Sequence, residues 1–379
     1  MKIGIVTYHR SLNCGAVLQA YALQTFLEKN FDVQASIVDC RVRISRKRFA
    51  FCFAGLKRFL GSVFYSLLTI GIEDWRRFRY DKFSRRHLHY SKFFGYASSD
   101  VDSSVFDAFC AGSDQIWNPV LSRGNMLFFL DFVPNDKLKI AYAPSIGLDE
   151  FPEEYRLKCK SLIKRFDKIS VRESSGAVML KELLGDEVPV LCDPTLLLKA
   201  ADYDKIASAP SMASRYICVY SMGNEQRVKK ALEKLMEQCD LPVMWLVGGH
   251  AASWHINRGR IKRISCFGPG EFLGYMKNAS FVLTNSFHGT AFSLIFGKPF
   301  HVVLNGTASD ARMISLLGRL GLDDHARCPE SEFLMQDFEL YNPKSVSDGL
   351  TKLAAEAKAF LGDVLPLHEY GSGNGGVIR

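Results

Sequence analysis

The sequence predicts an α/β fold built from two Rossmann-like domains that face each other across a cleft. Three observations lead to this prediction. Short runs of apolar and β-branched residues, typical of buried parallel strands, alternate along the chain with helical stretches. The alternation is interrupted at residues 199–214, where Ala, Ser and Asp together with Pro210 indicate an interdomain linker. The chain is 379 residues long, which is the length of two or three domains with an ample core.

In the first half the expected elements alternate between strand and helix. Residues 2–8 predict a buried strand, a polar loop follows it, and the apolar residues 16–29 predict a buried helix that Asn13 caps. This strand–loop–helix unit lacks the GxGxxG sequence of dinucleotide-binding proteins. Further along this half we expect strands at 33–40, 106–111, 139–145, 168–171 and 188–192, and helices at 151–166 and 174–184.

The second half repeats this alternation. Its expected strands are 216–220, 243–247, 281–283 and 300–304, and its expected helices are 225–238, 268–278, 288–296, 310–320 and 345–361. Two such halves joined by a linker form a glycosyltransferase-B-like architecture, which is an inference about fold only. We therefore place an N-terminal domain at 1–198, a C-terminal domain at 199–365, and a tail at 366–379 that is flexible by its Gly-rich composition.

Composition and charge restrict the class of function. The formal net charge of +8 suits an anionic substrate or a membrane surface, and no nucleic-acid partner is expected from it. The ten cysteines form no CxxC pair and no metal-ligand spacing, so we expect reduced thiols in a cytoplasmic protein. The start of the chain lacks a signal-peptide pattern, and no apolar run is long and uncharged enough to predict a transmembrane helix.

A basic and aromatic stretch at about 41–86 is a helical insertion in the first half. Its cationic residues form two groups, which are Arg41, Arg43, Arg46, Lys47 and Arg48, and then Arg76, Arg77, Arg79, Lys82, Arg85 and Arg86. One interpretation is an amphipathic helix in peripheral contact with an anionic membrane surface, at the inner membrane face. The alternative is an insertion that packs on its own domain and exposes a solvated basic face. The helical pattern alone does not separate the two.

The most informative segment is the strand-to-helix junction at 281–296. The apolar strand ends in polar residues, and His288 and Gly289 then open an apolar helix. In α/β sheets such junctions lie at the carboxyl edge of the strands, where ligands bind, and helix N-terminal N–H groups favour anions. Ser286, Gly289 and Thr290 are therefore candidate substrate-binding residues. His288, which exchanges a proton near neutral pH, is a candidate catalytic residue. The alternative is that His288 only caps the helix.

A second polar loop, 112–119, follows the expected strand at 106–111. A polar and aromatic sequence at this position suits a loop that lines a cleft, and Asp114 is the candidate catalytic group within it. The alternative is a capped turn in which Ser113 or Asp114 starts a short helix. Asn13, in the loop after the first strand, is a further candidate for substrate binding.

Four segments together resemble the polysaccharide pyruvyl transferase family. They are IGIVTYHRSLNCGAVLQAYALQ, AGSDQIWNP, SVRE followed by DPTLLL, and TNSFHGTAFSLIFGKPF, and their order and spacing match over nearly the whole chain. The resemblance implies an enzyme that transfers an enolpyruvyl unit from phosphoenolpyruvate to a sugar, usually as a cyclic ketal, in the cleft of the two-domain fold. It places basic residues of the family on Arg172 and Arg312 and the family's histidine on His288. Members whose motif reads Arg-Leu-His carry an arginine where this chain has Ser286.

The resemblance also implies a division of roles that suits this chemistry. Phosphoenolpyruvate carries a phosphate and a carboxylate, and arginine pairs bidentately with either group, so Arg172 and Arg312 are expected to hold the donor. His288 is expected to act as general acid or base, and Asp114 to orient or deprotonate an acceptor hydroxyl. No cofactor and no metal are expected, since phosphoenolpyruvate is a donor substrate. The expected acceptor is a carbohydrate or a lipid-linked saccharide.

Several alternatives stay open at this point. Arg172 with Glu173 fits a surface ion pair, Arg312 fits a solvated helix residue, and Asp193-Pro194 fits a structural turn. The first functional alternative is a glycosyltransferase that uses a nucleotide sugar, with Gly248-Gly249 approaching its diphosphate. The second is a membrane-associated scaffold that keeps the fold without the chemistry.

Overall fold

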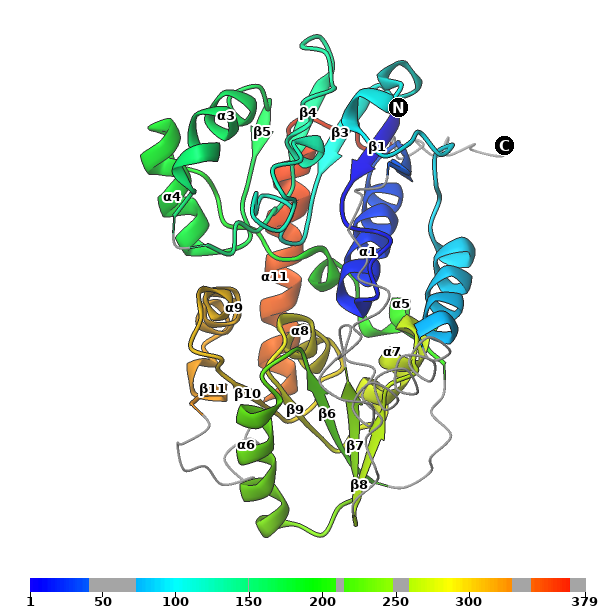
Figure 1. Cartoon of the computed structure of the whole chain (residues 1–379), viewed down its shortest axis with the longest axis vertical. Helices are drawn as coiled ribbons and strands as arrows, with labels where there is room; N and C mark the ends of the chain where they lie inside the picture. Colours follow the sequence, from blue (N-terminus) through cyan, green and yellow to red (C-terminus); the bar gives the residue numbers. More distant parts are fainter. Residues whose placement is uncertain (41–72, 149, 209–214, 248–258, 329–341, 369–379) are drawn as a thin grey trace, which may run out of the picture.

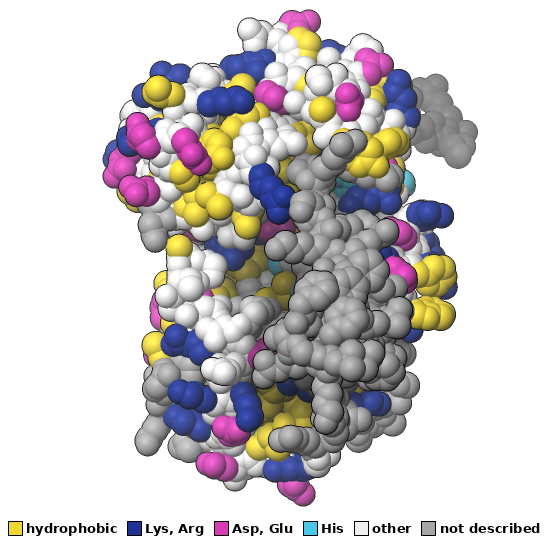
Figure 2. Space-filling view, in the orientation of Figure 1, with side chains coloured by type: hydrophobic (Ala, Val, Ile, Leu, Met, Phe, Trp, Pro, Cys, Tyr) yellow, Lys and Arg dark blue, Asp and Glu magenta, His cyan; other side chains and the backbone are white. Residues whose placement is uncertain are grey.

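The structure is a computed structural model, and it describes residues 1–40, 73–148, 150–208, 215–247, 259–328 and 342–368. The chain forms two α/β halves, drawn one above the other in Figure 1, and each half is built around a parallel sheet. Figure 2 shows a hollow between the upper and the lower half. The predicted fold class, an α/β protein with two Rossmann-like domains in a glycosyltransferase-B-like arrangement, is confirmed.

The sheet of the N-terminal half has five parallel strands in the order β2-β1-β3-β4-β5. They are β1 (Lys2–Val6), β2 (Gln34–Ile37), β3 (Ala108–Ala111), β4 (Leu138–Ala141) and β5 (Lys168–Ile169). Because the strands all run in one direction, the loops that follow them leave the sheet at a single edge, where ligands bind in such folds.

Helices of the N-terminal half follow the sequence expectation with small shifts. They are α1 (Cys14–Asn30), the helical residues 73–87, α3 (Glu153–Ile163) and α4 (Ser174–Leu184). Helix α1 begins two residues earlier than expected. The predicted cap is confirmed, because the side chain of Asn13 accepts hydrogen bonds from the N–H groups of Gly15 (2.9 Å) and Ala16 (3.4 Å).

The strand expected at 188–192 is wrong. Only Val190 pairs, in an isolated bridge with Val171 beside β5. Its two backbone hydrogen bonds run from Val171 N–H to the Pro189 carbonyl (3.0 Å) and from Leu191 N–H to the Val171 carbonyl (2.9 Å). Pro189 has no N–H of its own to extend the ladder.

The sheet of the C-terminal half has six parallel strands in the order β11-β10-β9-β6-β7-β8. They are β6 (Ile217–Ser221), β7 (Val243–Val247), β8 (Ile261–Ile264), β9 (Phe281–Thr284), β10 (Phe300–Val303) and β11 (Ala326–Arg327). The helices of this half are α6 (Glu225–Gln238), α7 (Pro269–Asn278), α8 (Phe287–Ile295) and α9 (Ala311–Arg319). Strand β9 and helix α8 form the junction that the sequence singles out.

The two halves are connected by more than one covalent link. The short helices η4 (Pro194–Leu197) and α5 (Ala200–Asp204) lead from one half to the other, and α11 (Pro343–Gly362) runs back alongside both (Figure 1). Past the end of α11, Asp363 lies 2.6 Å from Lys168, and the N–H of Asp32 donates to the Pro366 carbonyl (2.9 Å). One hydrophobic core contains side chains from α1, α7 and α8 together, so the halves pack on each other.

Some sequence predictions fall outside the described residues. Residues 41–72 of the basic insertion at 41–86 lie outside the described residues. The remaining residues of the insertion, 73–86, lie in the helix at 73–87. Gly248-Gly249 and most of the predicted flexible tail lie outside as well. Within the described residues, none of the helices combines the length and the low polarity needed to cross a bilayer.

Candidate active site

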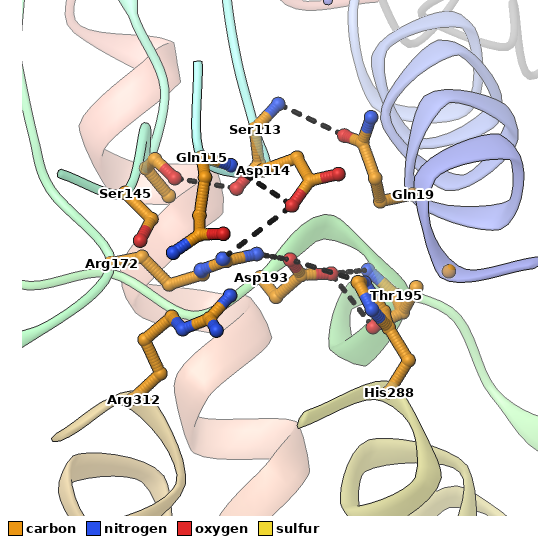
Figure 3. Close-up of polar contacts among 12 residues, drawn as sticks. Gln19, Ser113, Asp114, Gln115, Ser145, Arg172, Asp193, Thr195, His288 and Arg312 are labelled. Carbon is orange, nitrogen blue, oxygen red and sulfur yellow. Dashed lines mark hydrogen bonds and ion pairs between the residues drawn. The ribbon is translucent and has the colours of Figure 1, made fainter. Parts of the chain in front are cut away.

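The site is formed where the carboxyl ends of strands from both halves meet. From the N-terminal half come Asp114, which follows β3, and Arg172, which follows β5. Asp193 comes from the start of η4, and His288 from the first turn of α8 (Figure 3). All four residues are buried, Asp114 being the most exposed of them. The structure therefore brings both candidate catalytic residues together with Arg172, although they are far apart in the sequence.

Arg172 is held by two carboxylates and an aromatic ring. Its Nη1 atom lies 2.5 Å from an oxygen of Asp193, and its Nη2 atom lies 3.7 Å from an oxygen of Asp114. The guanidinium carbon lies 4.7 Å from the centre of the Phe287 ring, in a cation–π contact. Burial opposes the charge, but the carboxylates outweigh it and raise the pKa of Arg172, so the side chain stays cationic. Its Nε and Nη2 atoms have no hydrogen-bond partner among the described residues.

The alternative of a surface ion pair between Arg172 and Glu173 is wrong. Both side chains are buried, and Glu173 instead accepts hydrogen bonds from the Ser145 hydroxyl (3.1 Å) and from the N–H of Ile146 (2.8 Å). Glu173 thus fixes the loop after β4, while Arg172 turns its charge toward the site.

Asp193 joins the other charged groups and was missed as a functional residue. It does form the predicted turn, because its Oδ1 atom accepts from the N–H (3.0 Å) and the hydroxyl (2.8 Å) of Thr195. Its Oδ2 atom contacts Arg172 and lies 3.8 Å from Nε2 of His288. Burial by itself would raise the pKa of Asp193, but the neighbouring charges and the Thr195 hydrogen bonds lower it. The carboxylate is therefore ionised at neutral pH.

His288 does not cap helix α8. The N-cap position is Ser286, and the Nε2 atom of His288 is buried without a hydrogen-bond partner in the described part of the chain. Burial lowers the pKa of His288 below its ordinary value of 6.5, and the two arginines of the site lower it too. The carboxylates oppose this effect without reversing it. The imidazole is consequently neutral at pH 7 and can accept a proton.

The other three candidate residues at the start of α8 are all buried. Ser286 makes no side-chain capping bond, so the first-turn N–H groups have no side-chain acceptor from the cap. Thr290 is fully buried, and its hydroxyl donates to the Ser286 carbonyl (3.1 Å) within the helix. Gly289 packs on the end of β9, where a Cβ atom would lie 2.1 Å from the Thr284 hydroxyl oxygen. The Thr290 hydroxyl is therefore used within the helix, and the lack of a side chain at Gly289 allows α8 to pack closely on β9.

Asp114 sits in a loop that is tied to helix α1. The loop places Asp114 at a positive φ of 68°. Its neighbour Ser113 receives a hydrogen bond at its carbonyl from Thr7 (3.1 Å), and its N–H donates to Gln19 (2.9 Å) on α1. The Asp114 carbonyl accepts from the N–H of Ser145 (2.8 Å). These bonds fix the backbone and leave the carboxylate directed at Arg172 (Figure 3).

Arg312 completes the charged cluster from the opposite side. It is the second residue of α9, is half-buried, and points toward Arg172 in Figure 3. Its Nε atom donates to the Ser309 carbonyl (3.2 Å), and its terminal nitrogens have no partner in the described residues. Burial and the charge of Arg172 lower the pKa of Arg312 to about 10, so it is still cationic at neutral pH. Two guanidinium groups with unused donors thus face one space.

The arrangement can bind an anion with two acidic groups and move a proton beside it. Arginine donors suit phosphate and carboxylate oxygens, and the neutral His288 lies within the same cluster. Asn13 caps α1, and its side-chain oxygen is engaged by the N–H groups of Gly15 and Ala16. Among the described residues there is no group of three or more His, Cys, Asp or Glu side chains placed to hold a metal ion.

Comparisons with known proteins give one strong match. The family model described as polysaccharide pyruvyl transferase matches residues 13–307. No curated protein matches the sequence. Solved structures that align with the fold include a UDP-GlcNAc 2-epimerase from Methanocaldococcus jannaschii, with 13% identity, coverage of 94% of this chain and 100% of that chain, and a TM-score of 0.46. A glycosyltransferase from Streptomyces nogalater aligns with 11% identity, coverage of 97% and 96%, and a TM-score of 0.42. Likenesses of this size carry no argument about ligands.

Proposed function

Because the chain belongs to the polysaccharide pyruvyl transferase family, we propose that it transfers the pyruvyl unit of phosphoenolpyruvate to two hydroxyl groups of a saccharide. The product is a cyclic pyruvate ketal, and the acceptor is a sugar of a cell-surface polysaccharide or of its lipid-linked precursor. The observation that carries the proposal is the pair Arg172 and Arg312, whose unused donors face one space beside His288. Phosphoenolpyruvate has two anionic groups, and two guanidinium groups complement them.

The residues of the site suit the proton movements of this reaction. Two sugar hydroxyls form bonds to C2 of phosphoenolpyruvate, C3 gains one proton, and the bond between C2 and the phosphate oxygen breaks. The hydroxyls release two protons, of which one goes to C3 and the other leaves with inorganic phosphate. Neutral His288 can accept a hydroxyl proton and return it to C3 as imidazolium. Asp193 stabilises that imidazolium from 3.8 Å.

Helix α8 and Asp114 have supporting roles in this proposal. The start of α8 carries partial positive charge and N–H groups without a side-chain cap, which suits the leaving phosphate. Asp114 is the candidate for orienting the acceptor hydroxyl, since its carboxylate lies beside Arg172 at the same cluster. Phe287 stands next to the histidine where some members of the family have leucine, and its ring supports Arg172.

Ligand-induced thermal stabilisation tests the donor. Phosphoenolpyruvate is compared with pyruvate, inorganic phosphate and UDP-GlcNAc, using wild type, Arg312→Ala and, as control, Arg319→Ala. Arg319 lies on the same helix, but its guanidinium is engaged by Glu356 on α11 and by the Val190 carbonyl (3.1 Å). A ligand at one hundred times its Kd stabilises the folded state by about 2.7 kcal/mol. We expect phosphoenolpyruvate to raise the Tm of wild type and of Arg319→Ala, and Arg312→Ala to lose the shift.

The same measurement can overturn the proposal. A shift with UDP-GlcNAc and none with phosphoenolpyruvate would favour the nucleotide-sugar glycosyltransferase. Equal shifts with inorganic phosphate and phosphoenolpyruvate would show a phosphate site that does not recognise the carboxylate. Release of phosphate from phosphoenolpyruvate in the presence of saccharide acceptors, lost in His288→Ala by on the order of 10²-fold or more, separates an enzyme from a scaffold.

A further inference from the structure

The helix at 73–87 has an inner face that is locked onto the N-terminal half. Arg76 and Tyr80 on this face are buried. The Tyr80 hydroxyl lies 2.9 Å from the Cys14 sulfur, and Arg76 donates to the Leu12 carbonyl (3.4 Å). Leu12 and Cys14 flank Asn13 at the start of α1. The helix is therefore a fixed element of the fold, in direct contact with the loop that leads into α1.

The outer face of the same helix leaves large aromatic side chains in water. Trp75 is 61% exposed and Phe78 is 57% exposed, and their rings contact each other edge to face with centroids 5.8 Å apart. Lys82 and Arg86 follow at helical spacing along the same stripe and are exposed too, with Arg85 beside them. Of these three cations, none has an ion-pair partner in the described residues. Figure 2 shows hydrophobic side chains beside charged ones at this edge of the molecule.

A groove adjoins this stripe. Its volume is about 510 Å³, and it separates the helix from residues 205–208 and from the start of α7. The groove adds a further cation, Lys205, to Arg79, Lys82 and Arg86. Its one acidic lining residue, Glu271, is already paired with Arg79. Aromatic rings thus lie at one end of an open, cationic groove.

We propose that this outer face, defined by Trp75, Phe78, Lys82 and Arg86, docks the protein on an anionic lipid bilayer. Tryptophan and phenylalanine gain by leaving water for the interface between headgroups and acyl chains. Cations without protein partners attract the headgroup phosphates, and the groove admits one headgroup. The combination of exposed rings and unpaired cations on a helix that is rigidly anchored from behind is complementary to a bilayer surface.

The inference concerns the surface and is independent of the proposed chemistry. Binding to vesicles is measured by co-sedimentation, with phosphatidylcholine alone and with phosphatidylcholine containing phosphatidylglycerol. The docking variants are Trp75→Ser/Phe78→Ser and Lys82→Glu/Arg86→Glu in the full chain. Two matched controls change exposed residues elsewhere: Leu157→Ser/Val178→Ser on α3 and α4, and Lys352→Glu/Lys358→Glu on α11.

We expect wild type and both controls to bind the anionic vesicles and to bind phosphatidylcholine much more weakly. Each cation near an anionic surface raises the affinity about 5-fold, so losing two cations weakens binding on the order of 30-fold. Because Lys82→Glu/Arg86→Glu also adds two anions, its binding should be weaker by at least this factor. Trp75→Ser/Phe78→Ser should also lose binding at constant charge. All changed residues are exposed, and unchanged Tm values establish that the variants fold.

Three results would overturn the proposal. The first is that anionic vesicles bind wild type no better than neutral vesicles do. The second is that the docking variants bind as tightly as wild type, which would assign any membrane contact to another surface. The third is that inorganic phosphate displaces the protein from vesicles while sodium chloride at the same ionic strength does not, which would identify the groove as a site for free phosphate.

Discussion

Gly15 lies directly against the imidazole of His288, so that a Cβ atom on Gly15 would be 2.0 Å from the Nδ1 atom of the ring. Gly15 belongs to α1 of the N-terminal half, and His288 belongs to α8 of the C-terminal half. The two helix starts therefore meet at the site, and the absence of a side chain at position 15 allows the approach. The segment LNCGAVLQ thus has a packing role in the site, in addition to forming a helix.

Gly15→Ala should displace the imidazole while leaving the fold intact. The added methyl group overlaps the ring, and a displacement of about 1 Å in a catalytic group costs on the order of 10²-fold in rate. We expect kcat to fall by this factor, together with a loss of about 1–3 kcal/mol in unfolding free energy from the overlap. Gly362→Ala is the control, since its Cβ would lie 3.9 Å from the nearest atoms, at the end of α11. Wild-type kcat in Gly15→Ala would contradict the assignment of His288.

Asp193→Asn tests whether this carboxylate positions and tunes the cluster. Removing its charge leaves Arg172 without its closest partner, and breaking a buried pair costs about 3–5 kcal/mol of unfolding free energy. The carboxylate also raises the pKa of His288, so its removal should move the acid limb of kcat/KM to lower pH. Asp363→Asn, which removes a surface partner of Lys168, should change neither quantity. An acid limb that stays in place would reduce Asp193 to a structural role.

Two histidines with lowered pKa values predict acid sensitivity of different kinds. Burial lowers the pKa of His301 on β10 to about 3, and it lowers that of His288 as well. Below pH 6.5, the ordinary histidine pKa, the unfolded chain binds protons at these positions and the folded protein does not. The free energy of unfolding therefore decreases by about 1.4 kcal/mol for each histidine and each pH unit of acidification. The loss for each side chain ends at its folded pKa.

Urea unfolding at a series of pH values separates these contributions. His301→Gln should flatten the fall in unfolding free energy below pH 6.5 and leave the acid limb of kcat/KM unchanged. His288→Gln should abolish activity. Asp193 acts in the same direction at lower pH, because its lowered pKa gives stability that is present above 3.8 and is lost as the pH falls through the folded value. Stability that rises on acidification would contradict all of these assignments.

The fold class could be predicted from the sequence because it rests on local patterns, although strands β8 and β11 were not expected. Apolar runs and helix caps are readable one segment at a time, and Asn13 caps α1 as expected. The prediction of a strand at 188–192 was wrong because a run of apolar residues does not show how many backbone hydrogen bonds the adjacent strand can provide. Val190 makes one bridge at the edge of the first sheet and no more.

The site could be read only in part from the sequence. His288 and Asp114 follow strands, so the carboxyl-edge argument indicates them, whereas Arg172 and Arg312 come from the family resemblance. Asp193 was read as a turn, and it does form one; the contacts of its second oxygen come from segments 21 and 95 residues away. No local pattern reports such contacts. The alternative that Arg172 pairs with the adjacent Glu173 was wrong, because Glu173 accepts hydrogen bonds from the loop after β4 instead.

Gly289→Ala tests why the residue after the histidine is glycine. Its Cβ would lie 2.1 Å from Oγ1 and 2.8 Å from Cβ of Thr284. Thr284 Oγ1 donates to the Tyr220 carbonyl (2.7 Å) and accepts from the Ser286 N–H (3.1 Å), so it cannot move without breaking bonds that fix the start of α8. We expect a loss of about 3 kcal/mol in unfolding free energy, measured in urea, together with loss of activity.

A double-mutant cycle with Thr284→Ala tests whether the cost of Gly289→Ala comes from contact with Thr284. Thr284→Ala removes the hydroxyl that overlaps most, so Gly289→Ala should cost less in that background than in wild type, by about 1 kcal/mol. The residual cost reflects the Thr284 Cβ atom, which stays too close. Gly176→Ala on α4, whose Cβ would lie 3.4 Å from its nearest atom, serves as the control and should be tolerated. Additive costs in the cycle would show that the two residues do not contact in the folded protein, and the approach of α8 to β9 would then be wrong.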